Sequence, residues 1–268
     1  MKIYMLLFIL LLTSCIDLIV QEINYNSLFF SGGSWIELQK MNAMSIDPSA
    51  DKFSLQFWIS GGEVDTNEAP ALFSLTTSSG NIILSLLRDP NVSNRITTII
   101  NSQVDYIDVN NIDFSDEDNF YLISLIFSNN SNVKVYIDST KIISSDQNNL
   151  INFDDEMLIV GAIANEQRTI IENFWYGYID EIRLWNTHLS DSVITYHTKY
   201  ANKLGDHYRY TDINGNEIPS YLDSLIGIWR LNFTQPQIIA NDDSGFNNNG
   251  SIYTLLGYSI ELSKKGAE

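Results

Sequence analysis

Residues 177–186 read GYIDEIRLWN, and the strand that this stretch predicts constrains the fold more than any other part of the sequence. From residue 178 to residue 185 the side chains alternate with a period of two, which is the periodicity of a β-strand. This alternation places Asp180 on the same side as Ile182 and Leu184, the side that we expect to face the core. The segment therefore predicts a strand that carries one carboxylate toward the protein interior.

Further strands are predicted on both sides of this segment, because turn-forming clusters recur about every ten residues, as in sandwiches and barrels. Residues 120–127 are apolar on both faces, which is typical of a central strand, and one short helix is expected to begin after the N-cap residue Ser190. The chain therefore predicts an all-β domain over residues 25–262, followed by a polar tail at 263–268. The expected strands are Trp35–Leu38, Phe53–Ile59, Leu72–Leu75, Ile82–Leu87, Arg95–Ile100, Phe120–Phe127, Val133–Asp138, Met157–Val160, Tyr178–Trp185, Ile226–Phe233 and Tyr258–Leu262.

The first fifteen residues have the pattern of an export signal. Lys2 precedes the apolar run 3–12, which is too short for a permanent membrane span. The LTSC sequence that ends at Cys15 resembles the bacterial lipobox, in which the cysteine is acylated and becomes the new N-terminus. Cys15 is the only cysteine of the chain, so it cannot form an internal disulfide. We therefore expect residues 1–15 to be a lipoprotein signal peptide, residues 16–24 to be a short tether, and Cys15 to be lipidated.

Lipidation implies that the membrane is a partner and that the protein is extracytoplasmic, in the periplasm or on the cell surface. The formal net charge of −18 adds a second constraint. A surface with such an excess of carboxylates repels phosphate backbones, which argues against nucleic-acid binding.

Three segments together resemble the laminin-G-like, concanavalin A-like jelly-roll domains common in bacterial surface proteins. Residues 27–38 (SLFFSGGSWIEL) with 53–59 (FSLQFWI) are similar to the opening strands of that family. Residues 177–186 are close to its most specific segment. Residues 225–233 (LIGIWRLNF) and 243–250 (DSGFNNNG) are similar to a later strand and the loop after it. The resemblance implies a sandwich of two antiparallel sheets.

The resemblance also implies a structural calcium ion, because members of the family often bind calcium at the aspartate that corresponds to Asp180. Calcium takes six to eight oxygen ligands from carboxylates and carbonyls. The alternative is that backbone N–H groups satisfy Asp180 and that Asp243 caps a turn. The implied ligands are Asp180, Asp243, Asp242, Asn247 and the carbonyl of Gly33.

Other polar and aromatic residues have simpler expected roles. Glu181 and Arg183 are expected to form a solvated charge pair on the outer surface. A sugar site would need exposed aromatic rings, and the candidates are Trp175, Tyr176, Tyr178, Tyr208 and Tyr210. The remaining tryptophans, Trp35, Trp58, Trp185 and Trp229, are expected to pack inside the protein.

These observations favour a non-catalytic, membrane-anchored binding module for a carbohydrate or a protein partner. One alternative is a glycoside hydrolase or lyase of the same fold, which needs two carboxylates across the scissile bond. The chain shows no run of alternating acids, and its histidines, His188, His197 and His207, match no common zinc spacing. A second alternative is a structural envelope lipoprotein without a ligand.

Overall fold

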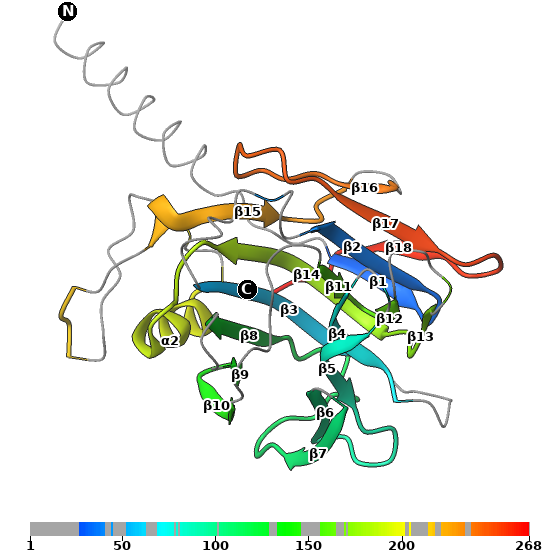
Figure 1. Ribbon diagram of the computed structural model, residues 1–268, viewed down its shortest axis with the longest axis horizontal. Helices are drawn as coiled ribbons and strands as arrows, with labels where there is room; N and C mark the ends of the chain where they lie inside the picture. Colours follow the sequence, from blue (N-terminus) through cyan, green and yellow to red (C-terminus); the bar gives the residue numbers. More distant parts are fainter. Residues whose placement is uncertain are drawn as a thin grey trace, which may run out of the picture.

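Two antiparallel β-sheets pack face to face in the computed structural model (Figure 1). The structure describes residues 27–40, 44, 52–62, 69–77, 79, 81–100, 102–128, 133–145, 156–164, 169, 171–201, 204, 214–217, 221–233 and 237–267. The predicted signal peptide, Cys15, the tether and the candidate residues Tyr208 and Tyr210 lie outside these ranges. None of the helices formed by the described residues has the length and apolar character needed to cross a membrane.

The predicted all-β, two-sheet jelly-roll fold is confirmed. The first sheet has the strand order β10-β9-β8-β3-β14-β1-β18, with β15 also paired to β14, and the second has the order β16-β17-β2-β11-β4-β5-β6-β7. The strands of the first sheet are β1 (Ser27–Ser31), β3 (Lys52–Gly61), β8 (Tyr121–Ser128), β9 (Val133–Ile137), β10 (Thr140–Ser145), β14 (Tyr176–Trp185), β15 (Leu225–Trp229) and β18 (Ile260–Ser263). Those of the second are β2 (Ser34–Lys40), β4 (Ala71–Thr76), β5 (Ile82–Arg88), β6 (Arg95–Ile100), β7 (Gln103–Asp108), β11 (Met157–Val160), β16 (Ile239–Ala240) and β17 (Gly250–Thr254).

Among the described residues, four short elements lie outside the two main sheets. Strands β12 (Ile163–Ala164) and β13 (Ile171–Glu172) pair with each other outside the two main sheets. Helix α2 (Asp191–Lys199) follows the predicted N-cap residue Ser190, and a 3-10 turn covers Leu222–Ser224. The predicted strand 226–233 is shorter than expected, because β15 ends at Trp229 and Leu231 has a positive φ of 58°.

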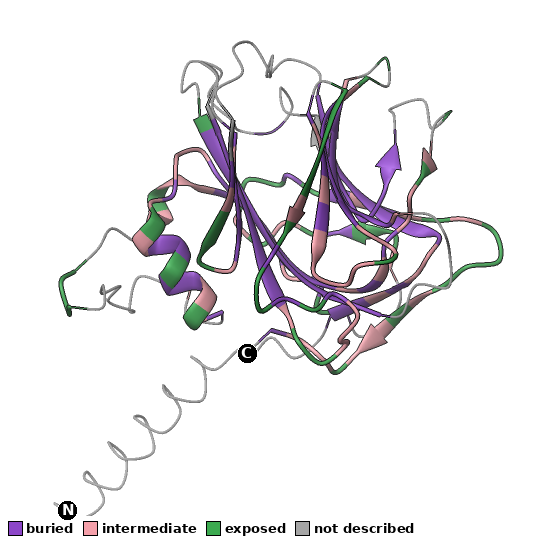
Figure 2. Cartoon of the chain, turned by 90° about the horizontal axis from the view of Figure 1, so that it is seen from below, coloured by how far each residue is buried: buried purple, intermediate pink, exposed green. Residues whose placement is uncertain are grey.

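The main core lies between the two sheets, where aromatic and aliphatic side chains from both inner faces meet. Phe53 and Phe127 stack across neighbouring strands with ring centroids 4.3 Å apart. Phe57 and Phe73 connect the first sheet to the second at 6.2 Å. Strand β8 is central, between β3 and β9, as its apolar residues on both faces predicted. Figure 2 shows the buried residues along both sheets, with α2 against the outer side of one of them.

A β-bulge in β14 changes the expected direction of Asp180. Asp180 lies opposite Trp58 of β3, but Ile182 lies opposite the neighbouring residue Phe57, so Glu181 is an extra residue in the pair. Glu181 has a φ of 23°, outside the strand region. Since Phe57 faces the core, Asp180 shares the outer face with Trp58. The prediction that Asp180 faces the same side as Ile182 and Leu184 was therefore wrong.

Helix α2 covers part of the outer face of the first sheet and buries polar groups there. Glu181 and Arg183 have relative exposures of 6% and 1%, so the prediction of a solvated pair was wrong. The Arg183 guanidinium donates to the Glu181 carboxylate and to the carbonyl of Ala201, just after the helix. Trp185 of the sheet packs against Val193 of the helix in the same layer. The outer face thus has its own buried layer beneath α2.

His197 of α2 is wholly buried in this layer. Its Nδ1–H donates to the Gln56 side-chain oxygen at 2.9 Å, and the Gln56 amide donates to Ser124 Oγ at 2.8 Å. The imidazole stacks on Trp185 with centroids 5.5 Å apart. Burial, with the nearby Arg183 charge as a smaller cause, holds the pKa of His197 well below its usual value.

The Phe53–Phe127 stack predicts a large effect of truncation. We expect Phe127→Ala to lower the free energy of unfolding by about 3–5 kcal/mol, because it removes a fully buried ring and leaves a cavity. Urea unfolding measures this change. Tyr106→Ala on β7 is the matched control, since Tyr106 is 67% exposed and its removal should cost less than about 0.5 kcal/mol. Equal effects of the two changes would contradict the assigned core.

The environment of His197 predicts a dependence of stability on pH. Because its pKa is lower in the folded state, the unfolded state binds more protons as the pH falls below about 6.5, and stability is lost in that direction. Between pH 7 and pH 5, we expect the free energy of unfolding to fall less in His197→Asn than in the wild type. Urea unfolding at both pH values measures this difference. Parallel losses in both proteins would show that His197 is not the group responsible.

Candidate functional site

The outer face of the first sheet carries a row of aromatic side chains beyond the edge of α2. Phe29 of β1 contacts Tyr176 and Tyr178 of β14, with ring centroids 5.3 and 5.0 Å apart. Phe120, just before β8, lies 6.2 Å from Tyr178. All four rings are half-buried, so each presents part of its surface to solvent. We call Phe29, Phe120, Tyr176 and Tyr178 the aromatic row.

The segment Lys264–Ala267, called the strap below, follows β18 and lies against this face. The side chain of Ser27 donates a hydrogen bond to the carbonyl of Lys265 at 2.7 Å. The backbone N–H of Ala267 donates to Asp180 Oδ2 at 2.9 Å. The predicted polar tail at 263–268 therefore begins with the last residue of β18 and continues as a packed segment of the sheet surface.

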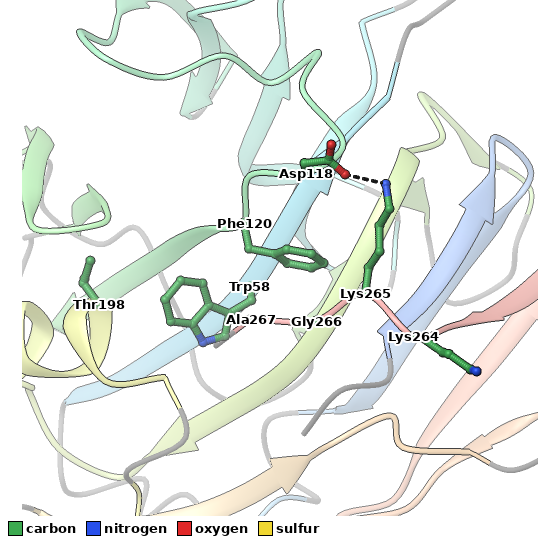
Figure 3. Close-up of a pocket in the computed structure, with 8 residues that line it drawn as sticks. All are labelled: Trp58, Asp118, Phe120, Thr198, Lys264, Lys265, Gly266 and Ala267. Atoms are coloured by element: carbon green, nitrogen blue, oxygen red, sulfur yellow. Dashed lines mark ion pairs between the residues drawn. The ribbon is translucent and has the colours of Figure 1, made fainter. Parts of the chain in front are cut away.

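The strap forms one wall of a pocket of about 460 Å³ (Figure 3). A small apolar cluster of Trp58, Leu122, Ala201 and Ala267, with Phe120 at its edge, lies on the same outer face. Helix α2 contributes Thr198 to the lining. The pocket is lined by Trp58, Asp118, Phe120, Thr198, Lys264, Lys265, Gly266 and Ala267.

Lys265 connects the pocket to the aromatic row. Its ammonium lies 2.9 Å from Asp118 Oδ1 and 3.5 Å from Glu117 Oε2, and the first of these pairs is drawn in Figure 3. The same ammonium lies 5.1 Å from the centroid of the Tyr178 ring. The hydrogen bond to Asp118 raises the pKa of Lys265 above its usual value. The pocket thus combines rings, hydroxyl and charged groups within one depression.

The predicted aromatic candidates separate into different environments. Tyr176 and Tyr178 belong to the aromatic row, on the pocket side of the sheet. Trp175 is wholly buried in the main core, so its predicted role in stacking on a ligand is corrected to packing. Trp229 also lies in the main core, whereas Trp58 and Trp185 are buried on the outer face of the first sheet and Trp35 on that of the second. Phe29, Phe120 and the strap were not predicted as site residues.

The candidate calcium ligands of the late loop have protein partners. Asp242 Oδ1 accepts the N–H groups of Ile228 and Ser244, both at 2.9 Å. Its Oδ2 accepts the Ser244 hydroxyl at 2.8 Å and the Asn248 N–H at 2.9 Å. Asp243 Oδ2 lies 3.8 Å from the Arg230 guanidinium. The two aspartates of the loop are thus paired with N–H groups, a hydroxyl group and the Arg230 guanidinium of the protein itself.

The strand register separates Gly33 from the late loop. Gly33 precedes Ser34, which lies opposite Thr254, whereas Asp242 and Asp243 follow Ala240, which lies opposite Gly250. At about 3.3 Å per residue, the two partner residues Gly250 and Thr254 are roughly 13 Å apart along β17. The Gly33 carbonyl instead accepts the N–H of Leu255 at 2.8 Å. Gly33 therefore lies toward the opposite end of β17 from the late loop, and its carbonyl is already hydrogen-bonded within the protein.

Asp180 also has backbone donors on both oxygens. Its Oδ1 accepts the N–H of Glu181 at 2.7 Å, and its Oδ2 accepts the strap N–H of Ala267. Asn247 lies exposed in the loop, with a positive φ of 59°. Among the residues that the structure describes, no group of three or more acidic, histidine or cysteine side chains is placed to hold a metal ion. The described residues do not fit the calcium ion that the resemblance implies, and a binding measurement is needed to test it.

Comparisons with known proteins agree with the architecture. A family model described as the concanavalin A-like lectin/glucanases superfamily matches residues 30–195. A Bacteroides ovatus protein described as a candidate carbohydrate-binding protein is similar in structure, with 13% identity and a TM-score of 0.53, over 88% of this chain and 59% of that one. No curated protein sequence matches the chain.

A sialidase of Trypanosoma rangeli is also similar in structure. Its identity is 14% and its TM-score is 0.50, over 67% of this chain and 28% of the sialidase chain. The chain thus spans about three fifths of the Bacteroides protein and less than a third of the sialidase. At these identities the two likenesses concern the fold alone.

Calcium provides a direct test of the loop geometry. Because the candidate ligands have protein partners and Gly33 is distant, we expect the same thermal midpoint in chelator and in about 10 mM calcium. Even a weak site with a dissociation constant of about 1 mM would add about 1.4 kcal/mol at that concentration, a shift of several degrees. Magnesium at the same concentration is the control for ionic strength. A calcium-specific rise that is lost in Asp180→Ala would restore the family-type metal site.

Proposed function

The chain belongs to the concanavalin A-like lectin/glucanases superfamily, and from this membership we propose that it is a non-catalytic carbohydrate-binding module. The observation that carries the proposal is the pocket on the outer face of the first sheet, beside the aromatic row. The volume of about 460 Å³ lies in the range of small-molecule sites.

The chemistry of the pocket matches that of a sugar. Sugar rings have apolar C–H faces that pack on aromatic rings, and Phe120 in the lining and Tyr178 beside it present such surfaces. Sugar hydroxyls both donate and accept hydrogen bonds. Asp118 supplies acceptors, Lys265 supplies donors, and the Thr198 hydroxyl supplies an acceptor while it donates to the Ile194 carbonyl at 3.0 Å.

The charges around the pocket favour a neutral glycan. Asp118 and Glu117 are matched by the two lysines of the strap, Lys264 and Lys265, so the four charged side chains at the pocket sum to zero. The whole chain carries a formal net charge of −18. An acidic sugar would therefore find no excess of positive charge at the pocket and would meet repulsion from the whole chain at long range.

The same lining supports a binding role over hydrolysis. A glycosidase of the usual type places two carboxyl groups about 5–10 Å apart on either side of the scissile bond. Asp118 is the one carboxylate among the described residues that line the pocket, and its side chain is 84% exposed and paired with Lys265. Such an acid is solvated and lacks the burial that raises a general acid's pKa.

The proposed location is the cell envelope. Residues 1–15 have the pattern of a lipoprotein signal, and acylation of Cys15 would place the domain on a membrane surface. A tethered module of this kind holds glycans near the membrane without altering them.

Binding to neutral glycans on an array, followed by titration of the best ligand, tests the proposal. We expect Phe120→Ala to weaken affinity by about tenfold or more, since it removes a stacking surface from the pocket, and Thr198→Val to weaken it by a smaller factor. Tyr106→Ala, on β7 of the other sheet, is the matched control and should bind as the wild type does.

Two results would overturn this proposal. Affinity that is unchanged in Phe120→Ala would place the glycan elsewhere on the protein. Release of reducing ends from the bound glycan, abolished by Asp118→Asn, would identify a hydrolase and not a binding module.

A further inference from the structure

We infer that Asp180 is a positioning residue that holds the strap in place as a wall of the pocket. The inference rests on the proposed function for the role of the pocket, but the contact between Asp180 and the strap stands independently of any ligand. It also departs from the family expectation, because it gives the aspartate of the GYIDEIRLWN segment a backbone partner in place of a metal ion.

The geometry at Asp180 supports this assignment. The bulge at Glu181 turns the Asp180 side chain to the outer face, where it is wholly buried. Its Oδ1 accepts the Glu181 N–H and is thereby fixed to its own strand at 2.7 Å. Its Oδ2 accepts the Ala267 N–H at 2.9 Å, across 87 residues of sequence. One carboxylate thus joins β14 to the strap through charge-assisted hydrogen bonds.

The other polar contacts of the strap are weaker. The Lys265 ion pairs with Glu117 and Asp118 involve side chains that are 38–84% exposed, and pairs of this kind contribute little to stability. The Ser27 hydroxyl makes a neutral bond to the Lys265 carbonyl. The hydrogen bond between Asp180 and Ala267 is buried and involves a charged group. It should therefore contribute most to holding the strap against the sheet.

Packing of the strap against the sheet also has an unfavourable contribution to its free energy. The indole N–H of Trp58 is buried on this face and has no hydrogen-bond partner among the described residues. A buried donor without an acceptor costs free energy, which is recovered when water reaches it. The seated strap is therefore held against an opposing cost, and the loss of one strong contact should shift it measurably toward an open state.

Limited trypsin digestion followed by mass spectrometry tests this inference without a glycan. Trypsin cleaves after lysine, so cleavage after Lys264 and Lys265 reports on the strap. We expect Asp180→Ala to accelerate cleavage there by about tenfold or more, and Asp180→Asn to accelerate it less, because the amide oxygen still accepts a hydrogen bond. Cleavage after Lys141, which is exposed on the edge strand β10 of the first sheet, should keep its rate.

A second variant separates strap anchoring from damage to the sheet. Ala267→Pro removes the N–H donor of the strap and leaves Asp180 unchanged, so it should reproduce the faster cleavage. Asp108→Ala, an exposed aspartate on β7, is the matched control and should cleave as the wild type does.

Three outcomes would overturn the inference. Wild-type cleavage rates in both Asp180→Ala and Ala267→Pro would show that the contact does not hold the strap. Faster cleavage after Lys141 as well would indicate general unfolding. Protection of the wild-type strap that depends on calcium would assign Asp180 to a metal. Failure of the glycan experiments alone would leave the cleavage result standing, so the two proposals can fail separately.

Discussion

The one-residue bulge at Glu181 is the constraint on which the outer face of the first sheet depends. Strand β14 pairs with β3 along its length, and a perfect alternation would send Asp180 into the apolar space between the sheets. An ionised carboxylate there would have to be paired at considerable cost. The extra residue returns Ile182 and Leu184 to the core and sends Asp180 outward, where backbone N–H groups satisfy it.

The same bulge divides the outer face into two regions, which are covered by different parts of the chain. Beyond it, toward Trp185, helix α2 buries a polar layer in which His197, Gln56 and Arg183 are hydrogen-bonded. Before it, toward Tyr176, the face carries the strap and the aromatic row, whose rings stay half exposed. The helix thus covers one end of the sheet face, and the other end stays partly open beside the pocket.

The candidate site could be predicted from sequence only in part. Tyr176 and Tyr178 were identified because aromatic residues on a strand are visible in the sequence. Phe120 and Asp118 lie just before β8, and nothing in their local pattern indicates that the strap, more than a hundred residues later, forms the opposite wall. The strap itself reads as a polar tail, because the contact that anchors it is a backbone N–H of Ala267, and backbone groups carry no sequence signal. Trp175 shows the reverse case, since its aromatic character suggested a ligand and the fold buries it.

The sequence by itself determined the all-β class, most strand positions, the start of α2 and the two-sheet architecture. Each of these follows from local periodicity, capping residues and the family-like segments, which require no knowledge of distant contacts. Only the tertiary structure decided which face Asp180 occupies, whether Glu181 and Arg183 meet water, and which rings surround the pocket. The physical reason is that a bulge shifts the register by one residue without a clear sequence signature, and burial on an outer face depends on what packs there from elsewhere in the chain.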